Sequence, residues 1–129
     1  MKLHRDDIIG QNLFTALGNG WVEINGRRHE GSLLVLPQHL AAWRPASFEQ
    51  LSAEDFRPVI DQGCEILLFG SGTRQRFPAP ALLQELMAAR IGIETMDSAA
   101  ACRTFNILVA EGRKVAAALI IERSEPTTP

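Results

Sequence analysis

The second half of this chain alternates apolar runs that suit buried strands with segments that suit helices. Apolar runs at 65–69, 91–96 and 114–121 are separated by helix-forming segments at 81–90 and 98–110. A chain that alternates strand and helix usually packs its helices on a parallel or mixed sheet, so this order predicts an α/β fold. We expect strands 65–69 and 91–96 to run parallel, because a crossover helix joins them.

Residues at the predicted helix boundaries support this reading. Ser52 and Asp55 form a capping-box pattern, with Asp in place of the usual Glu. Pro58 removes a backbone donor, so the helix that begins there should be short or kinked. Asp97 or Ser98 is expected to cap the helix over 98–110.

The first half of the chain predicts strands and turns. Asn25-Gly26, between two short apolar-bearing runs, predicts a β-hairpin with a type I′ turn. The run at 32–37 lacks alternation and suits a strand buried on both faces. The segment 39–50 is ambiguous, and we expect mostly loop with a strand near Trp43.

The length of 129 residues suits one domain, and 46% apolar residues are enough for a core without metal or disulfide. We therefore expect a single α/β domain over 1–121, with three layers and a central mixed β-sheet flanked by helices, and with an N-terminal β-hairpin. A disordered polar tail is expected over 122–129.

Charge and cysteine usage limit the classes of partner. The formal net charge is −2, from 13 basic and 15 acidic side chains, which gives no electrostatic reason to bind nucleic acid. The most apolar window, 31–43, is too short to span a bilayer, so we expect no membrane insertion. Cys64 and Cys102 lie far apart and are expected to be free thiols. Interruption of any N-terminal apolar run by charges argues against a signal peptide, and the expected location is cytoplasmic.

One stretch, "EILLFGSGTRQRFPAP", suggests a ligand site. Its glycines follow a predicted strand, and glycines let backbone N–H groups approach an anion. If strands 65–69 and 91–96 are parallel, this loop and the start of the 98–110 helix share the rim where open α/β sheets usually bind ligands. The candidate ligand-binding residues are Gly70, Ser71, Gly72, Thr73, Arg74, Asp97 and Arg103.

The same glycines also suit a purely structural strand exit. The loop lacks the lysine of a Walker motif and the third glycine of a dinucleotide fingerprint. Asp97 would itself occupy helix N-terminal donors and repel an anion. Both interpretations of the loop stay open.

No catalytic constellation emerges, so no catalytic residue is assigned and an enzyme is the less favoured class. Cys102, near a helix start, is either an activated thiol or a small buried hydrophobe. His4, His29 and His39 show no metal-ligand spacing with each other or with cysteine. We therefore predict neither a metal nor a cofactor.

The chain resembles a known small α/β family. The motifs that carry the resemblance are Gly70–Thr73, Asp97, the Ala-Cys-Arg-Thr-Phe-Asn run at 101–106 and Glu-Gly-Arg at 111–113, and the likeness extends over about 6–121. Members occur in archaea, bacteria and mitochondria; many are of unknown function, and the mitochondrial branch includes complex I assembly factor 3. The resemblance implies a three-layer α/β fold with a central mixed sheet.

Two functional hypotheses follow. The resemblance implies a non-catalytic interaction module that acts as an assembly factor for respiratory complex I, with complex subunits or other assembly factors as partners. The alternative is a small-molecule or anion-binding protein, or an enzyme, that uses the Gly70–Thr73 loop and the N-terminus of the 98–110 helix. The sequence leaves homo-oligomerisation open.

Overall fold

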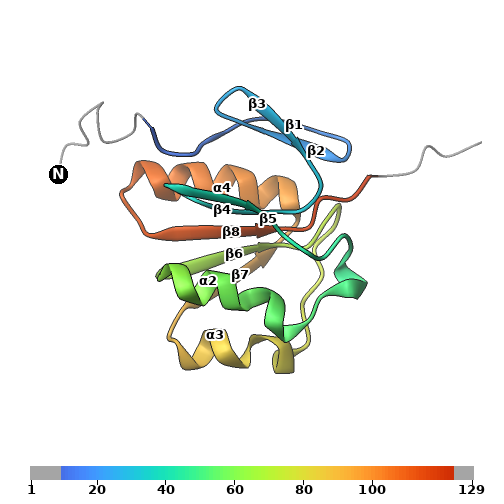
Figure 1. Cartoon of the computed structure of the whole chain (residues 1–129), viewed down its shortest axis with the longest axis vertical. Coiled ribbons are helices and arrows are strands. Elements are labelled where there is room, and N and C mark those ends of the chain that lie inside the picture. The colour runs from blue at the N-terminus through green and yellow to red at the C-terminus, as the bar shows by residue number, and fades with distance from the viewer. Residues whose placement is uncertain (1–9, 124–129) are drawn as a thin grey trace, which may run out of the picture.

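The structure is a computed structural model that describes residues 10–123, and it contains two β-sheets (Figure 1). The smaller sheet is antiparallel, in the order β1 (Phe14–Gly18), β2 (Trp21–Ile24) and β3 (Arg27–Glu30). The larger sheet has the order β5 (His39–Ala42), β4 (Leu33–Leu36), β8 (Val115–Leu119), β6 (Ile66–Gly70) and β7 (Gly92–Met96). The helices are α2 (Arg57–Gln62), α3 (Gln84–Ala88) and α4 (Ser98–Ala110), with 3-10 turns η1 (Phe48–Gln50), η2 (Ala53–Phe56) and η3 (Pro80–Leu83).

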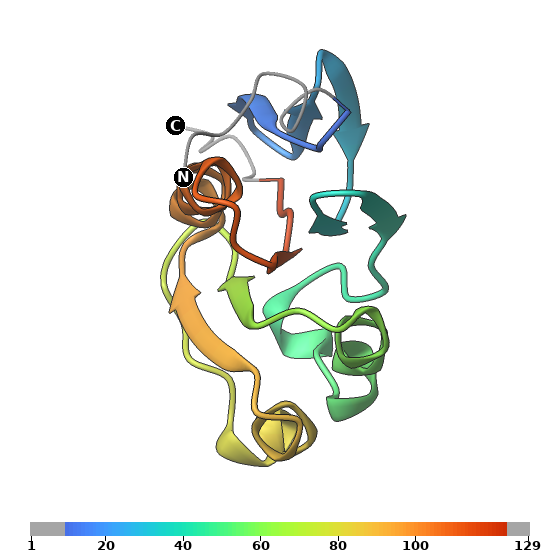
Figure 2. The same ribbon diagram turned by 90° about the vertical axis from the view of Figure 1, so that its left-hand side faces the viewer.

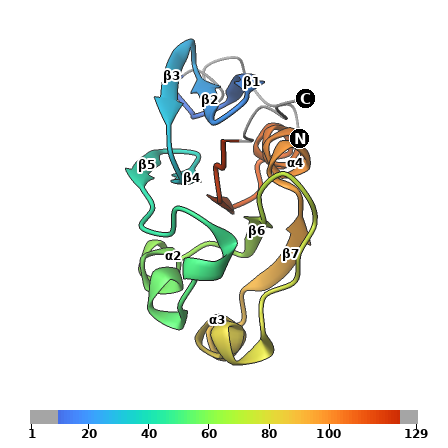
Figure 3. The same cartoon turned by 90° about the vertical axis from the view of Figure 1, so that its right-hand side faces the viewer.

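The larger sheet forms the middle of three layers (Figure 3). Helix α4 and the three-stranded sheet cover one face, and α2 and α3 lie on the other side. This arrangement confirms the expected three-layer α/β fold with a mixed sheet. Residues 1–9 of the expected domain, and 124–129 of the expected tail, lie outside the described residues.

Alternating side chains of the central strands build a separate core on each face. On β8, Val115, Ala117 and Leu119 pack toward α4, and Ala116 and Ala118 pack toward α2 and α3. Successive strand residues point to opposite faces, so a strand covered on both sides has no polar face. This explains why the buried runs of the sequence lack alternation.

The strand pairing agrees with the crossover argument. Strands β6 and β7 are parallel, with Ile66 opposite Gly92 and Gly70 opposite Met96. Strand β8 is parallel to β6 and antiparallel to β4, which makes the sheet mixed. The hairpin is also confirmed: Asn25 and Gly26 have φ values of 51° and 82°, as a type I′ turn requires.

Three local expectations need correction or refinement. Residues 39–42 form strand β5 against β4, where we expected mostly loop. The helix expected over 81–90 is a 3-10 turn followed by the short α3, and Arg90, with φ of 61°, leaves the helix before Gly92 begins β7. The helix that contains Pro58 is short, as expected, and follows the 3-10 turn η2.

The connection over 71–80 leaves the end of β6 and runs beside the outer edge of β7 (Figure 2). The Gln75 side-chain amide donates to the Thr95 carbonyl at 3.0 Å. This contact engages a carbonyl of a terminal strand and fixes the path of the loop toward α3.

Candidate functional site

The glycine loop and the start of α4 meet at one rim of the sheet. Gly72 N–H donates to the Ser98 hydroxyl at 2.9 Å, and Ser98 N–H donates to the Gly72 carbonyl at 2.8 Å. The Ser98 hydroxyl in turn donates to the Ile120 carbonyl at 2.7 Å. One buried side chain therefore joins the chain after β6, the start of α4 and the end of β8.

Both glycines of the loop have a steric reason to be glycine. A Cβ on Gly70 would lie 2.8 Å from the Ser98 hydroxyl oxygen and 2.7 Å from a methyl of Leu119. Gly72 has a φ of 105°, and a Cβ there would lie 2.1 Å from a carboxylate oxygen of Glu122. At Gly70 the neighbours include the Ser98 backbone, which cannot move aside, whereas at Gly72 a residue with a Cβ would have to displace the ion-paired ends of Glu122 and Arg76 and adopt a left-handed backbone conformation.

A partly buried arginine joins this loop to the segment after β8. Arg76 donates to the Ser71 carbonyl through Nη2 at 2.6 Å and to Glu122 Oε1 at 2.7 Å. Its guanidinium also lies over the Phe48 ring, 4.9 Å from the centroid, and its side chain is 15% exposed. Glu122, at the start of the expected tail, is thereby held against the domain.

A cleft of about 130 Å³ opens at this rim. Its apolar wall includes Leu17 and Trp21 from the smaller sheet and Ile120 after β8. Its charged groups are the carboxylates of Asp97 and Glu122, and no arginine, lysine or histidine of the described residues lines it. The cleft therefore suits an apolar or cationic group better than an anion.

The backbone donors of the loop are already engaged. Ser71 N–H donates to the Met96 carbonyl at 2.9 Å, Gly72 N–H to Ser98, and Thr73 N–H to Glu122 Oε1 at 3.3 Å. Asp97 caps α4, as predicted, by accepting from Ala100 N–H at 2.8 Å. An anion at this position would have to displace these bonds.

The structure unites only some of the predicted ligand residues. Gly72, Thr73 and Asp97 line the cleft, whereas Gly70 and Ser71 are buried behind it. Arg74 is exposed and does not line the cleft. Arg103, also exposed, lines a separate hollow with Asn106. The predicted ligand site stays a prediction, and the geometry provides no cation for it.

The cleft also contains a thiol, which is not activated. Cys102 is 2% exposed, and desolvation raises its pKa to about 12 despite the nearby Arg103. A thiol with so high a pKa remains protonated at neutral pH and is a poor nucleophile. Among residues 10–123, no three His, Cys, Asp or Glu side chains gather in a metal-binding arrangement.

Ser98 was predicted only as a possible helix cap, and Arg76 was considered as a source of positive charge beside the loop but was not assigned to the ligand site. Glu122 was assigned to the tail, because nothing in its neighbours indicates that a side chain 46 residues earlier binds it. Asn106 was missed for a similar reason: its amide accepts from Phe14 N–H at 2.8 Å and donates to the Phe14 carbonyl at 2.7 Å. Such long-range polar pairs leave no periodic signal in the sequence.

These features define a small mixed-sheet α/β domain, and its fold is similar to several solved structures. A crystal structure of a Bordetella parapertussis protein is 35% identical and covers 88% of this chain and 98% of that chain, with a TM-score of 0.83. A solution structure of a Bordetella pertussis protein, described as a Mth938-like domain, is 30% identical with a TM-score of 0.82, over 97% of this chain and 95% of that one.

The chain belongs to the family described as protein of unknown function (DUF498/DUF598), which it matches over residues 14–120. It is 35% identical over 103 residues to an uncharacterized protein of Rhodobacter capsulatus, covering 80% of this chain and 79% of that one. These matches confirm the family resemblance inferred from the sequence motifs.

The chain is also similar to proteins named NADH dehydrogenase [ubiquinone] 1 alpha subcomplex assembly factor 3. It is 32% identical over 130 residues to the Xenopus tropicalis protein, covering 99% of this chain and 70% of that one. The Bos taurus protein is 32% identical over 120 residues, covering 92% of this chain and 65% of its own length. Both relatives are therefore longer than the region that this chain matches.

Within residues 10–123, none of the helices combines the length and the apolar composition that crossing a bilayer requires.

Proposed function

We propose that this chain is a non-catalytic interaction module that assists assembly of the respiratory NADH:quinone oxidoreductase, complex I. The observation that carries the proposal is the similarity to named complex I assembly factors over 99% of this chain. The buried Cys102, whose pKa is raised to about 12, is consistent with a binding role rather than with a thiol nucleophile at the rim. We propose complex I subunits or other assembly factors as the partners, and the cytoplasm as the location.

Phe77 is the surface residue that we assign to partner contact. Its side chain is 71% exposed, the largest fraction among the large apolar side chains that the structure describes. It lies in the 71–80 connection, where replacement does not disturb either core. Exposed aromatic side chains are enriched among the residues that contribute most to protein–protein binding.

Affinity capture from native membranes tests this function. The tagged full chain should recover complex I subunits or known assembly partners, and Phe77→Ala should lower their yield. Ile107→Ala is the matched control, because Ile107 is 58% exposed but lies on α4. Capture of neither partner class, together with normal NADH oxidation in a deletion strain, would contradict the proposal.

The alternative function is small-molecule binding at the rim, and the cleft beside Gly72 supports it. Glu122 is already ion-paired with Arg76, but Asp97 forms no ion pair among the described residues, so we propose a small organic amine rather than an anion as the ligand class. A thermal-shift screen of amines, phosphates and carboxylates tests it, since ligand at 100 times its Kd stabilises by roughly 2.7 kcal/mol. No shift with any compound, or equal shifts in Asp97→Asn, would count against a site here.

A further inference from the structure

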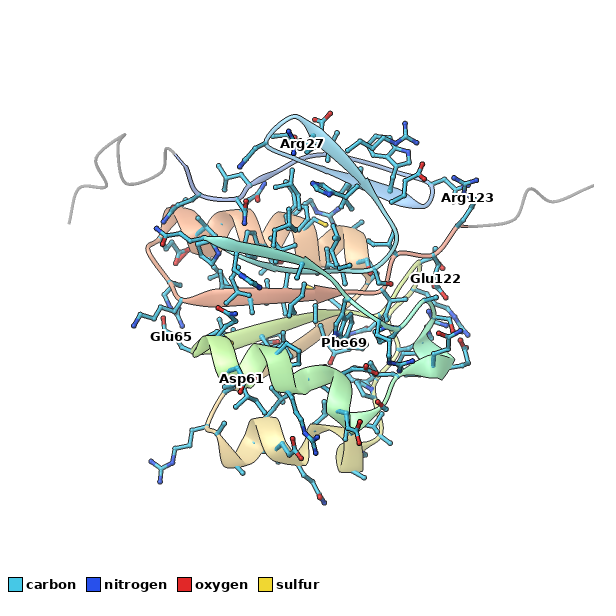
Figure 4. All side chains as sticks on the ribbon, in the orientation of Figure 1. Arg27, Asp61, Glu65, Phe69, Glu122 and Arg123 are labelled. Carbon is cyan, nitrogen blue, oxygen red and sulfur yellow. The ribbon has the colours of Figure 1, made fainter. Side chains whose placement is uncertain are left out.

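A second and larger cavity lies at the opposite end of the sheet. It has a volume of about 560 Å³ and is bounded by the turn after β4, the end of α2 and the turn between α4 and β8. Figure 4 shows the two ends of the sheet: Glu65, which precedes β6, lies at one end, and Glu122 lies at the other. A cavity of this size suits a metabolite of nucleotide size, since small-molecule sites commonly measure about 300–1,000 Å³.

The charge of this cavity is the reverse of that at the rim. Arg113, Lys114 and His39 line it, and none of the lining residues is Asp or Glu. Glu65 stands beside it, accepting from Arg113 Nε at 3.3 Å and from Lys114 N–H at 3.0 Å. These bonds lower the pKa of Glu65 and keep it charged, so it offsets part of the Arg113 charge.

The Lys114 ammonium also contributes to the lowered pKa of Glu65 through its charge, but it donates no hydrogen bond to that carboxylate. Among the described residues it forms no ion pair, and its side chain is exposed at the mouth of the cavity. Lysine is a compact point charge with three donors, which suits an oxyanion. With Arg113, Lys114 and His39 around the cavity and Glu65 as the acidic group beside it, basic side chains outnumber acidic ones there, which favours an anionic ligand.

Three glutamine side-chain amides also line the cavity. Gln11, Gln38 and Gln62 line the cavity, and no other described residue bonds their side chains. Each amide can donate to an oxyanion or bond the polar groups of a larger ligand. Buried Cys64 and Val115 form apolar parts of the lining.

We propose that this cavity binds a small organic anion whose phosphate or carboxylate group is held by Lys114 and Arg113. The glutamine amides orient the remainder of the molecule against the apolar lining. The site lies at the opposite end of the sheet from the Gly70–Thr73 rim and is independent of the complex I role proposed above.

Titration of the ¹⁵N-labelled full chain, followed by NMR, tests this site with inorganic phosphate, citrate and AMP as separate probes. Saturable shifts of the amides of Gly63, Gly112 and Lys114 are expected with at least one probe. Lys114→Gln should weaken the Kd about tenfold or more, because a charge-assisted hydrogen bond is lost. Added salt should weaken binding further.

Arg27→Gln is the matched control, since Arg27 is an exposed arginine on β3 that does not line this cavity. It should leave the Kd unchanged. A response to citrate alone identifies a carboxylate ligand, and a response to phosphate and AMP identifies a phosphate ligand. Absence of saturable shifts with every probe, or an equal Kd in Lys114→Gln with an unchanged spectrum elsewhere, would overturn the proposal. Neither result depends on capture of a protein partner.

Discussion

Gly72 and Ser98 form two reciprocal hydrogen bonds at the carboxyl ends of the parallel strands β6 and β7. Gly72 N–H donates to the Ser98 hydroxyl at 2.9 Å, and Ser98 N–H donates to the Gly72 carbonyl at 2.8 Å. Because the Ser98 hydroxyl also reaches the Ile120 carbonyl, this residue fixes the position of α4 relative to β6 and β8. The rim is therefore a rigid junction whose stability can be measured one group at a time.

Ser98→Ala should lower the free energy of unfolding by roughly 1–3 kcal/mol, because it leaves a buried N–H and a buried carbonyl unpaired. Denaturant-induced unfolding measures the change. Thr104→Ala is the control: its hydroxyl bonds only the Ala100 carbonyl within α4, at 2.9 Å. The control should change stability by no more than about 0.5 kcal/mol. Equal losses of unfolding free energy in the two variants would mean that the Ser98 hydrogen bonds stabilise the fold no more than the Thr104 bond within α4 does.

Gly72→Ala should destabilise by roughly 2–4 kcal/mol, since it combines a φ of 105° with a clash against Glu122. Gly112→Ala is the control that measures the cost of a positive φ without a steric clash, because Gly112 has a φ of 76° and a Cβ there meets nothing within 4 Å. The control should cost about 1 kcal/mol. Thermal unfolding of the two variants separates the steric contribution, and a smaller loss for Gly72 would contradict the close approach.

Phe105→Ala should cost roughly 3–5 kcal/mol, because the side chain is fully buried and packs edge-to-face against Phe14 with centroids 5.3 Å apart. Ile107, two residues along α4, is 58% exposed, and Ile107→Ala should have little effect. Chemical denaturation of both variants gives the comparison. A loss well under 1 kcal/mol at Phe105 would show that α4 presents a different face to the sheet.

Asp55 should make stability depend on pH in the acid range. Burial raises its pKa, but the hydrogen bonds from Arg44, at 2.7 Å to each carboxylate oxygen, and from Ser52 outweigh burial and lower it. The folded pKa therefore lies below the unfolded value of about 3.9. The stabilisation is present above that value and is lost as the pH falls through the folded pKa.

Asp55→Asn should therefore lower the Tm at pH 7 and reduce the fall in Tm on acidification. Asp61→Asn, at an exposed position on α2, should keep the wild-type dependence. Calorimetry between about pH 7 and pH 2.5 measures both profiles. If the Tm of Asp55→Asn falls on acidification as much as that of the wild type, Asp55 does not contribute to the pH dependence of stability.

Both cysteines should react slowly in the native protein. Burial raises the pKa of Cys102 to about 12 and also raises that of Cys64, so thiolate is scarce at pH 8. A disulfide exchange reagent should modify both thiols rapidly only after unfolding, with Cys64→Ala separating the two. Rapid stoichiometric modification of native Cys102 would contradict its burial.

Periodic and local signals accounted for most of the fold. The turn at Asn25-Gly26, the cap at Asp97 and the parallel pairing of β6 with β7 each follow from short-range patterns with a clear physical cause. Strand β5 was predicted only in part, as a strand near Trp43 in a segment expected to be mostly loop, because His39–Ala42 is short and weakly apolar and becomes a strand by pairing with β4. Tertiary pairing overrode local propensity there.

The candidate site was predicted less well. Topology placed the loop and α4 at one rim, but side-chain partners depend on distances between segments that the sequence does not encode locally. Arg28 illustrates this. A two-residue turn at Asn25-Gly26 places Arg28 opposite Glu23, as observed, yet the Arg28 guanidinium lies over the Trp21 ring, 4.2 Å from the centroid, and Glu23 accepts a hydrogen bond from Thr15. Register was predictable, whereas the choice of partner was not.

The path of the 71–80 connection also limits the addition of a further strand at one edge of the central sheet. Of the two terminal strands of the central sheet, β7 is flanked by that connection, and Gln75 engages the Thr95 carbonyl. A strand from another molecule would have to displace this loop to pair with β7, so the loop protects that edge of the sheet from strand addition.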